Sequence, residues 1–368
     1  MTTVNRAQVE QAIDQYQDPY YQKPLSQVNA IKAIQISSEG DVSVELEFAY
    51  PNSKLAGGIK TLLAEAISQL PGVKTASIEI VTMIPVSKGQ NNLPAMEGVK
   101  NIIAVASGKG GVGKSTTAVN LALALAANGA KVGILDADIY GPSQGLMLGV
   151  EPGGRPEVQQ LDGQALMKPI IARGIQVMSM AFLVDENTPM VWRGPMVSGA
   201  LQQLLNQTLW QDLDYLFVDM PPGTGDIQLT LAQRVPVAGA IIVTTPQDLA
   251  LLDAKKGIEM FRKVNVPVIG VVENMSTHIC SQCGHTEHLF GEGGGQRIAD
   301  QYHTDLLGFL PLSMAIREQV DGGMPTVVAE PDGQLSYVYQ EIARRAAALL
   351  SQQTLQAAVV PNITIVDD

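Results

Sequence analysis

A glycine-rich loop near residue 110 carries the residue types best suited to chemistry in this chain. It matches the phosphate-binding pattern G-x-x-x-x-G-K-[ST] and follows the apolar run Ile102–Ala106. Glycines let backbone N–H groups turn toward a triphosphate, Lys114 supplies a charge at the β- and γ-phosphates, and Ser115 offers a hydroxyl to Mg²⁺. The predicted nucleotide-binding residues of the loop are Gly108, Lys109, Gly110, Gly111, Val112, Gly113, Lys114, Ser115 and Thr116.

Acidic residues follow two later apolar runs. Asp136 and Asp138 come at the end of Val132–Leu135, and Asp219 comes directly after Tyr215–Val218. In a parallel sheet the carboxyl ends of the strands share one edge, where ligands bind. We therefore predict that Asp219 binds Mg²⁺ and that Asp138 positions the attacking water. Asp136 remains open between a role at the nucleotide and a helix cap or buried hydrogen-bonding carboxylate.

Two further segments bear on the nucleotide. The glycine-rich turn Gly223–Asp226 is suited to sensing the γ-phosphate with its N–H groups. The segment Val271–Ser276 lacks the N-K-x-D sequence that a guanine pocket commonly uses, and Asn274 offers an amide that can pair with adenine. The sequence therefore predicts ATP as the nucleotide, with Asn274 and Pro311 lining the base.

Cys280 and Cys283 form the second candidate centre. Their spacing alone leaves four interpretations open: a shared iron–sulfur cluster, zinc with His285 and His288, a redox dithiol, or idle surface thiols. A four-iron cluster usually needs about four thiolates. Since the chain has two cysteines, a two-fold dimer would complete that number across its axis.

Composition limits the partners. A formal net charge of −12 argues against non-specific binding to nucleic acid, which needs clustered Lys and Arg. No apolar stretch is long enough to span a bilayer, and the first residues lack an apolar secretion core. We expect no nucleic-acid partner, no membrane partner and a cytoplasmic location. Two closely spaced cysteines fit a reducing compartment better than a disulfide framework.

Apolar runs alternate with helical patterns over most of the chain, which predicts an α/β fold: a mostly parallel P-loop sheet with helices on both faces. The candidate strands are Ile102–Ala106, Val132–Leu135, Tyr215–Val218, Ala240–Thr244, Val268–Val272 and Leu306–Leu310. A small α+β domain precedes it, with a strand around Val42–Phe48, a helix around Leu55–Leu70 and a strand around Ala76–Val81. The predicted boundaries are 1–86 for the small domain, 87–98 for a linker, 99–352 for the ATPase domain and 353–368 for a flexible tail.

The phosphate loop resembles the deviant form K-G-G-x-G-K-[ST] of the MinD/ParA branch of P-loop ATPases, because Lys109 stands five residues before Lys114. In that branch the first lysine reaches the phosphates bound by the partner subunit. The resemblance therefore implies an ATP-dependent homodimer in which Lys109 and Lys114 both serve catalysis.

Further motifs closely resemble the Mrp/ApbC iron–sulfur cluster carrier ATPases over roughly residues 5–350. They are Trp192–Met196, Asp219–Asp226, Thr245–Gln247, Val272–Ser276 and the pair Cys280 and Cys283. The resemblance implies slow, Mg²⁺-dependent ATP hydrolysis and a homodimer that holds a labile cluster on Cys280 and Cys283. We expect the four-iron type, and the two-iron type remains open. It also implies scaffold or donor proteins that load the cluster and apo iron–sulfur proteins that receive it.

Residues 1–86 resemble the accessory domain of iron–sulfur assembly that often precedes this ATPase. Relatives of that domain often carry a cysteine after a Thr-Pro turn, whereas this chain reads Ala49–Lys54 there, without a cysteine. The expected role of this domain is therefore docking or target recognition.

Two other functions share the same loop. A positioning ATPase like MinD or ParA acts on membrane or DNA, and the acidic C-terminal end offers no basic amphipathic helix for either surface. A zinc-stabilised nucleotide switch would use the cysteines structurally. Metal analysis of protein purified without oxygen separates the carrier from the switch.

Overall fold

A computed structural model of the chain describes residues 4–88, 93–161, 163–183, 194–280 and 282–359. The chain divides into two compact units. One is formed by residues 87–346, and the other combines residues 1–86 with the C-terminal residues from Ala347 onward. Of the motif Trp192–Met196, the first two residues lie outside the described part, as do residues 89–92 of the predicted linker.

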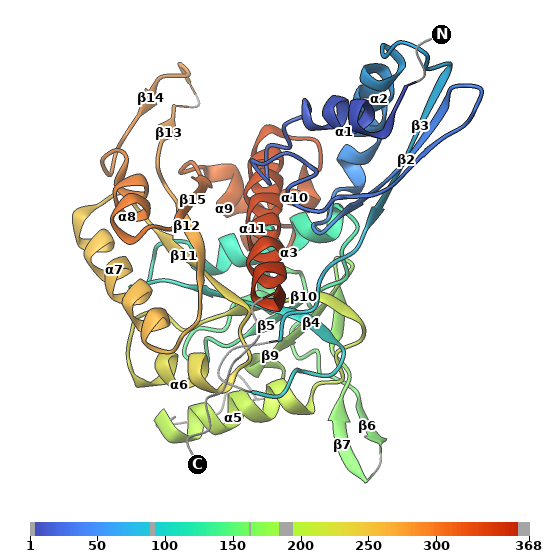
Figure 1. Cartoon of the computed structure of the whole chain (residues 1–368). Coiled ribbons are helices and arrows are strands. Elements are labelled where there is room, and N and C mark those ends of the chain that lie inside the picture. Colours follow the sequence, from blue (N-terminus) through green and yellow to red (C-terminus); the bar gives the residue numbers. More distant parts are fainter. Residues whose placement is uncertain (1–3, 89–92, 162, 184–193, 281, 360–368) are drawn as a thin grey trace, which may run out of the picture. The chain divides into compact units, whose positions relative to one another are not determined.

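The larger unit is built, within the described residues, on an eight-stranded sheet with the order β15-β12-β11-β4-β10-β5-β9-β8 (Figure 1). Neighbouring strands run parallel except at the edge, where β8 is antiparallel to β9. In sheet order the strands are β15 (Asp305–Phe309), β12 (Val268–Glu273), β11 (Gly239–Thr244), β4 (Val99–Ala106), β10 (Leu213–Asp219), β5 (Val132–Asp136), β9 (Ile175–Ser179) and β8 (Ile170–Ala172). The predicted mostly parallel sheet is confirmed, and each of the six candidate strands overlaps an observed one.

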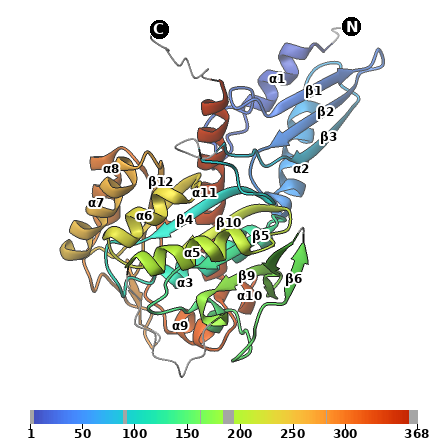
Figure 2. The same ribbon diagram turned by 90° about the horizontal axis from the view of Figure 1, so that it is seen from below.

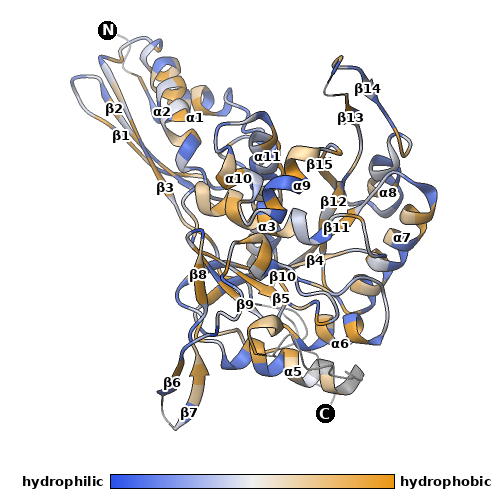
Figure 3. Ribbon diagram, turned by 180° about the vertical axis from the view of Figure 1, so that it is seen from behind, coloured by the Kyte–Doolittle hydropathy of each residue, from blue (hydrophilic) through white to orange (hydrophobic). Residues whose placement is uncertain are grey.

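Helices cover both faces of this sheet. The chain moves from β4 to β5 in one direction and from β10 through β11 and β12 to β15 in the other, so right-handed crossovers put the connecting helices on opposite faces. One face carries α5 (Gly194–Gln207), α6 (Asp226–Arg234), α7 (Asp248–Lys263) and α8 (Gly294–Tyr302), while the other carries α3 (Lys114–Ala127), α9 (Met314–Asp321) and α10 (Thr326–Ala329) (Figure 2). A sheet covered on both faces needs strands that are apolar throughout, and the strands of the large sheet are mainly in hydrophobic colours in Figure 3.

Shorter elements complete the larger unit. A four-residue helix, α4 (Gln144–Met147), follows β5, and a 3-10 turn at Met180–Phe182 follows β9. Two hairpins stand apart from the sheet: β6 (Val158–Leu161) with β7 (Gln164–Met167), and β13 (His278–Ile279) with β14 (Thr286–Glu287). The sequence did not predict these hairpins or the strands β8 and β9.

The smaller unit contains a three-stranded sheet in the order β1-β2-β3, with β1 antiparallel and β3 parallel to β2. Its elements are α1 (Arg6–Asp14), β1 (Ile31–Ile36), β2 (Asp41–Phe48), α2 (Ser53–Ser68) and β3 (Thr75–Thr82). The predicted alternation in β2 is confirmed, since Val42, Val44, Leu46 and Phe48 are buried. The sequence missed α1 and β1.

The last helix, α11 (Gln334–Val359), corrects the prediction of a flexible tail from residue 353. Residues 353–359 are helical, because Gln, Leu and Ala in Gln352–Ala357 are good helix formers. Gln352 Nε2 also donates a hydrogen bond to the carbonyl of Tyr21 at 3.3 Å, which ties these turns into the smaller unit. Residues 360–368 lie outside the described part. None of the described helices has the length and apolar character needed to cross a bilayer.

Candidate nucleotide site and cysteine hairpin

The glycine-rich loop connects β4 to α3 at the carboxyl edge of the large sheet. Gly113 precedes α3 with φ at +79°, in the left-handed region, and a Cβ there would lie 2.2 Å from Asn274 Nδ2. At Gly108 a Cβ would lie 2.2 Å from the backbone carbon of Asp253. Only glycine avoids both the strain at the first position and the overlap at the second. The conformation of the loop therefore requires glycine at both positions.

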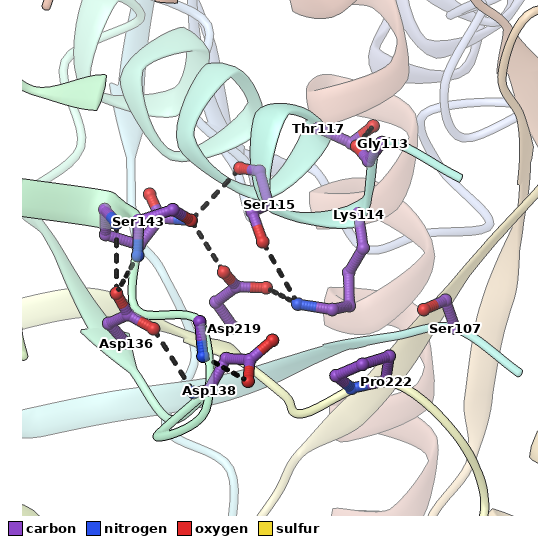
Figure 4. Close-up of polar contacts among 12 residues, drawn as sticks. Ser107, Gly113, Lys114, Ser115, Thr117, Asp136, Asp138, Ser143, Asp219 and Pro222 are labelled. Atoms are coloured by element: carbon purple, nitrogen blue, oxygen red, sulfur yellow. Dashed lines mark hydrogen bonds and ion pairs between the residues drawn. The ribbon is translucent and has the colours of Figure 1, made fainter. Parts of the chain in front are cut away.

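A buried cation–carboxylate cluster lies at the start of α3 (Figure 4). Lys114 Nζ forms an ion pair with Asp219 Oδ1 and also donates to Ser115 Oγ at 3.2 Å. The side chains of Lys114 and Asp219 are 6% and 0% exposed. A hydroxyl and a carboxylate therefore surround one cation, the ammonium group. This is the oxygen donor set that suits Mg²⁺, so Ser115 and Asp219 fit the predicted metal role.

The remaining carboxylates lie beside this cluster. Asp136 is fully buried and accepts hydrogen bonds from the backbone N–H groups of Ser143 at 2.8 Å and Gln144 at 3.0 Å. Burial first, and the charge of Asp219 second, raise the pKa of Asp136 to about 7, although these N–H groups oppose the rise. Asp136 thus organises the start of α4, the structural role that the sequence left open.

Asp138 is partly buried and faces the same charges (Figure 4). Burial raises the pKa of Asp138, the positive charge of Lys114 lowers it, and the negative charge of Asp219 raises it. The carboxyl group of Asp138 also accepts the N–H of Gly141 at 3.3 Å. The carboxyl group of Asp138 is therefore close enough to both Lys114 and Asp219 for their charges to act on it.

Gln144 is a residue that the sequence reasoning missed. Its Nε2 donates to Asp219 Oδ2 at 2.8 Å and to the carbonyl of Ser115 at 3.1 Å. Its Oε1 is buried and, among the described residues, has no hydrogen-bond partner. Gln144 holds the carboxylate of Asp219 toward Ser115, but a glutamine eight residues after a strand carries no sequence signal for such a contact.

The predicted γ-phosphate sensor lies against the phosphate loop. The backbone N–H of Gly223 donates to the carbonyl of Ser107 at 2.9 Å, and Gln228 Nε2 donates to the carbonyl of Pro222 at 2.6 Å. The side chain of Lys109 is partly exposed, and its Nζ donates to Gln247 Oε1 at 3.4 Å. Lys109 therefore lies at the loop surface, held within its own chain by one long hydrogen bond.

A cavity of about 500 Å³ opens beside the phosphate loop. Gly113, Thr116, Asn274 and Pro311 line it, so the two residues predicted for the base do meet at one cavity. The side chain of Asn274 is already engaged, because its Nδ2 donates to the carbonyl of Val112 at 2.8 Å and its Oδ1 accepts the N–H of Met275 at 2.9 Å. A primary amide has a second N–H and a second lone pair, so contact with a base is still open to it.

Cys280 and Cys283 lie at the tip of the β13–β14 hairpin (Figure 1). The N–H of Cys280 donates to the carbonyl of His285 at 2.9 Å, and the N–H of Gly284 donates to the carbonyl of Cys280 at 2.9 Å. Hydrogen bonds from the backbone N–H groups of Cys283 and Gln282, and then from the Cys283 side chain, lower the pKa of the Cys280 thiol. The turn stabilises a thiolate at Cys280, and both sulfurs belong to partly or fully exposed residues.

His288, one of the two histidines that zinc binding would use, is directed elsewhere. His288 Nδ1 lies 3.0 Å from the carbonyl oxygen of Ser276, and its Nε2 lies 3.8 Å from Glu292 Oε1. Among the described residues no group of three or more His, Cys, Asp or Glu side chains is arranged to hold a metal ion. Within one chain the described geometry therefore offers the two cysteines, without a third protein ligand.

Comparison with family models covers both units. A model described as the NUBPL iron-transfer P-loop NTPase matches residues 98–347. A model described as an iron–sulfur cluster assembly protein matches residues 6–80.

Individual relatives extend the similarity over nearly the whole chain. A protein of Pseudomonas fragi described as an iron–sulfur cluster carrier protein is 66% identical over 282 residues, which cover 77% of this chain and 97% of the relative. An Escherichia coli K12 protein of the same description is 51% identical over 357 residues, covering 97% and 95%.

Among solved structures, a nucleotide-binding protein from Archaeoglobus fulgidus in complex with ADP matches with a TM-score of 0.55 and 37% identity. That match covers 65% of this chain and 91% of the other. The cell division ATPase MinD of Pyrococcus furiosus shares the fold, with a TM-score of 0.50 and 22% identity over 67% of this chain and 97% of its own.

Proposed function

This chain belongs to the iron–sulfur cluster carrier family of P-loop NTPases, and from that premise we propose that it is an ATP-hydrolysing carrier that works as a homodimer. Two copies hold one iron–sulfur cluster on Cys280 and Cys283 of both chains and transfer it to apoproteins.

The observation that carries this proposal is the cysteine turn. It presents Cys280 and Cys283 at the tip of a hairpin, with N–H groups directed at the Cys280 sulfur, and the described residues add no third ligand nearby. A cluster of four irons needs about four thiolates, so a single chain supplies half of them. A two-fold axis through the cluster supplies the other half. Exposed cysteines also suit a cluster that is passed on to another protein. A thiolate of the recipient can replace each cysteine as a ligand without oxidation or reduction.

The nucleotide part of the proposal assigns one role to each residue of the buried cluster. Lys114 leaves Asp219 and binds the β- and γ-phosphates. Ser115 and Asp219 would hold Mg²⁺, which would supply positive charge against the charge that develops on the phosphate oxygens. Asp138 orients the attacking water, and Lys109 of each chain reaches the nucleotide of the other.

The base and the small unit complete the assignment. Adenine occupies the cavity between Asn274 and Pro311, beside the phosphate loop. The smaller unit docks donor or recipient proteins, since its β2–α2 connection, Ala49–Asn52, has no thiol of its own.

The decisive test is anaerobic reconstitution of the full chain with iron and sulfide. We expect a brown dimer with about four iron atoms per two chains, and transfer of that iron to an apo four-iron protein in the presence of a chelator. Cys280→Ala and Cys283→Ala lose the iron but keep the affinity of the native chain for MgATP, because neither residue contacts the nucleotide cavity. This retained affinity serves as the folding control.

Two results would overturn the assignment. A variant with both cysteines replaced by Ala that keeps its full iron complement removes the cysteines from the cluster site. If protein purified without oxygen contains one zinc atom per chain, the assignment changes from a cluster carrier to a zinc-stabilised nucleotide switch. Sedimentation with liposomes or DNA in the presence of MgATP tests the positioning ATPase, and we expect no binding to either.

A further inference from the structure

The side chain of Asn274 joins two parts of the larger unit that are far apart in the sequence. It lies immediately after β12, is nine-tenths buried, and donates from Nδ2 to the carbonyl of Val112 in the phosphate loop at 2.8 Å. Its backbone N–H donates to the carbonyl of Thr244 at the end of β11 at 2.7 Å. The residue is thus fixed to the sheet by its backbone and to the phosphate loop by its amide.

The chain from Asn274 to Cys280 is held at successive residues. The N–H of Ser276 donates to the carbonyl of Leu310 at 3.0 Å, and the N–H of Leu312 donates to the carbonyl of Thr277 at 2.7 Å. His278 and Ile279 then form strand β13, which ends one residue before Cys280. Five residues therefore connect Asn274, which contacts the phosphate loop, to the first thiolate, and backbone hydrogen bonds hold two of them, so we expect a shift at one end to be passed along the segment.

Backbone strain lies next to the contact. Met275 has φ at +56°, in the left-handed region, and its N–H is held by Asn274 Oδ1 at 2.9 Å. A residue with a side chain in this conformation costs about 1 kcal/mol. The amide of Asn274 therefore also maintains the bend through which the segment leaves the sheet.

The returning side of the hairpin is anchored at the same place. His288 Nδ1 donates to the carbonyl of Ser276 at 3.0 Å, and the N–H of Gly295 at the start of α8 donates to Glu273 Oε2. Both ends of the segment that carries the cysteines are therefore anchored near the carboxyl end of β12. We expect a displacement of this end of β12 to move the whole hairpin.

The cavity beside the phosphate loop touches the same segment. Gly113 and Thr116 line it from the phosphate loop, and Asn274, Met275 and His278 line it from the segment that leads to Cys280. A nucleotide bound there contacts both ends of the Asn274 link.

We propose that Asn274 is a positioning residue that transmits the state of the nucleotide to the cysteine pair through its hydrogen bond to Val112. The inference rests on the proposed function, since it takes the loop as the ATP site and the cysteines as the cluster site. Closure of the phosphate loop around the phosphates moves the Val112 carbonyl, and Asn274 carries that movement into the segment ending at Cys280.

The two cysteines are the only thiols of the chain, so their alkylation reports on the hairpin alone. In the native full-length protein without cluster, Mg²⁺ with a non-hydrolysable ATP analogue changes the rate of alkylation by about fivefold or more, the lower range for coupled sites. In Asn274→Ala and Asn274→Asp, at analogue concentrations that saturate each variant, the rate no longer responds. The Asp variant keeps an acceptor for the Met275 N–H but presents an oxygen to the Val112 carbonyl.

Ser276→Ala is the matched control. Its hydroxyl donates to the carbonyl of Leu310 at 3.1 Å in the same buried segment, and its removal leaves the contact between Asn274 and Val112 in place. We expect this variant to keep the native response. A native response in either Asn274 variant overturns the proposal, and so does its loss in Ser276→Ala, because a general loosening of the segment would then explain it.

A measurement on the native chain alone covers the case in which the Asn274 variants bind no nucleotide. The proposal requires the alkylation rate of the native cysteines to change when the analogue saturates the chain. An unchanged rate overturns the proposal without any variant. Iron loading is measured separately. If the chain binds no cluster but its alkylation rate still responds to the nucleotide analogue, the carrier function is refuted and the coupling through Asn274 is not.

Discussion

The ammonium group of Lys114 lies against the carboxylate of Asp219, and the two side chains are 6% and 0% exposed. This ion pair places a positive charge beside Ser115 and Asp219, the two residues that would hold Mg²⁺, so the buried carboxylate is balanced by a cation of the same chain. Binding of MgATP must separate the pair, since Lys114 is then needed at the phosphates.

Lys114→Ala lowers the free energy of unfolding of the nucleotide-free protein by about 3 kcal/mol, because it leaves a buried carboxylate without its cation. Lys131→Ala is the control. Lys131 pairs with Asp212, but the side chains are 63% and 70% exposed, so solvent screens the pair and we expect a much smaller loss of stability from this substitution than from Lys114→Ala. Urea denaturation followed by circular dichroism measures both. Equal losses in the free energy of unfolding for the two variants would show that burial of the Asp219 carboxylate does not depend on Lys114.

The stability of the nucleotide-free protein has a pH dependence that comes from Asp136. Burial and the charge of Asp219 raise the pKa of Asp136 to about 7, whereas an unfolded Asp has a pKa of about 3.9. Its contribution to the free energy of unfolding is therefore complete below about pH 4 and is lost as the pH rises through about 7.

Asp136→Asn removes this titration. We expect the variant to gain stability relative to the native protein as the pH rises from 4.5 to 7.5, about the window between the two pKa values, in thermal denaturation. Asp212→Asn is the control. Lys131 lowers the pKa of Asp212, so the contribution of Asp212 to the free energy of unfolding is already complete above about pH 4 and does not change in this window. If the native and Asp136→Asn curves run parallel, the carboxyl group of Asp136 does not titrate in this window.

Lys109→Ala keeps nucleotide binding and loses hydrolysis by about 100-fold, because a charge at the transition state is removed. Lys114→Ala loses both binding and hydrolysis. If Lys109 acts on the partner's nucleotide, a mixture of the two inactive variants regains activity: the Lys109→Ala chain binds ATP and the Lys114→Ala chain supplies Lys109. Phosphate release from the mixture measures this. A mixture as inactive as its components would place Lys109 at its own nucleotide, where Gln247 now holds it.

Gly113→Ala abolishes nucleotide binding, since its Cβ would lie 2.2 Å from Asn274 Nδ2 and displace the amide that holds the loop. Gly174 has a nearly identical φ of +80°, but a Cβ there has open space. Both substitutions cost about 1–2 kcal/mol of backbone strain. Titration with a fluorescent ATP analogue should therefore show binding to Gly174→Ala and none to Gly113→Ala. A similar affinity in both variants would refute the explanation by overlap with Asn274.

Six strands of the large sheet were predictable because each contains a continuous apolar run. A strand covered on both faces, such as Gly239–Thr244, is an uninterrupted buried run. The strands β8 and β9 were not predictable, since Ile171 is exposed at the sheet edge and the run Ile175–Ser179 is interrupted by Gln176. The C-terminal turns were misjudged for a different reason: their polar composition suggests a tail, but Gln352 is bound by Tyr21, more than three hundred residues earlier.

The sequence by itself determined the phosphate loop, the carboxylates at the strand ends and the cysteine pair, because each is a local pattern whose residue types limit its chemistry. Only the tertiary structure decided how these patterns meet. It paired Lys114 with Asp219, added Gln144 to that carboxylate, and gave the amide of Asn274 to the carbonyl of Val112. Such contacts join residues far apart in the chain, and they depend on strand order and helix placement rather than on spacing along the sequence.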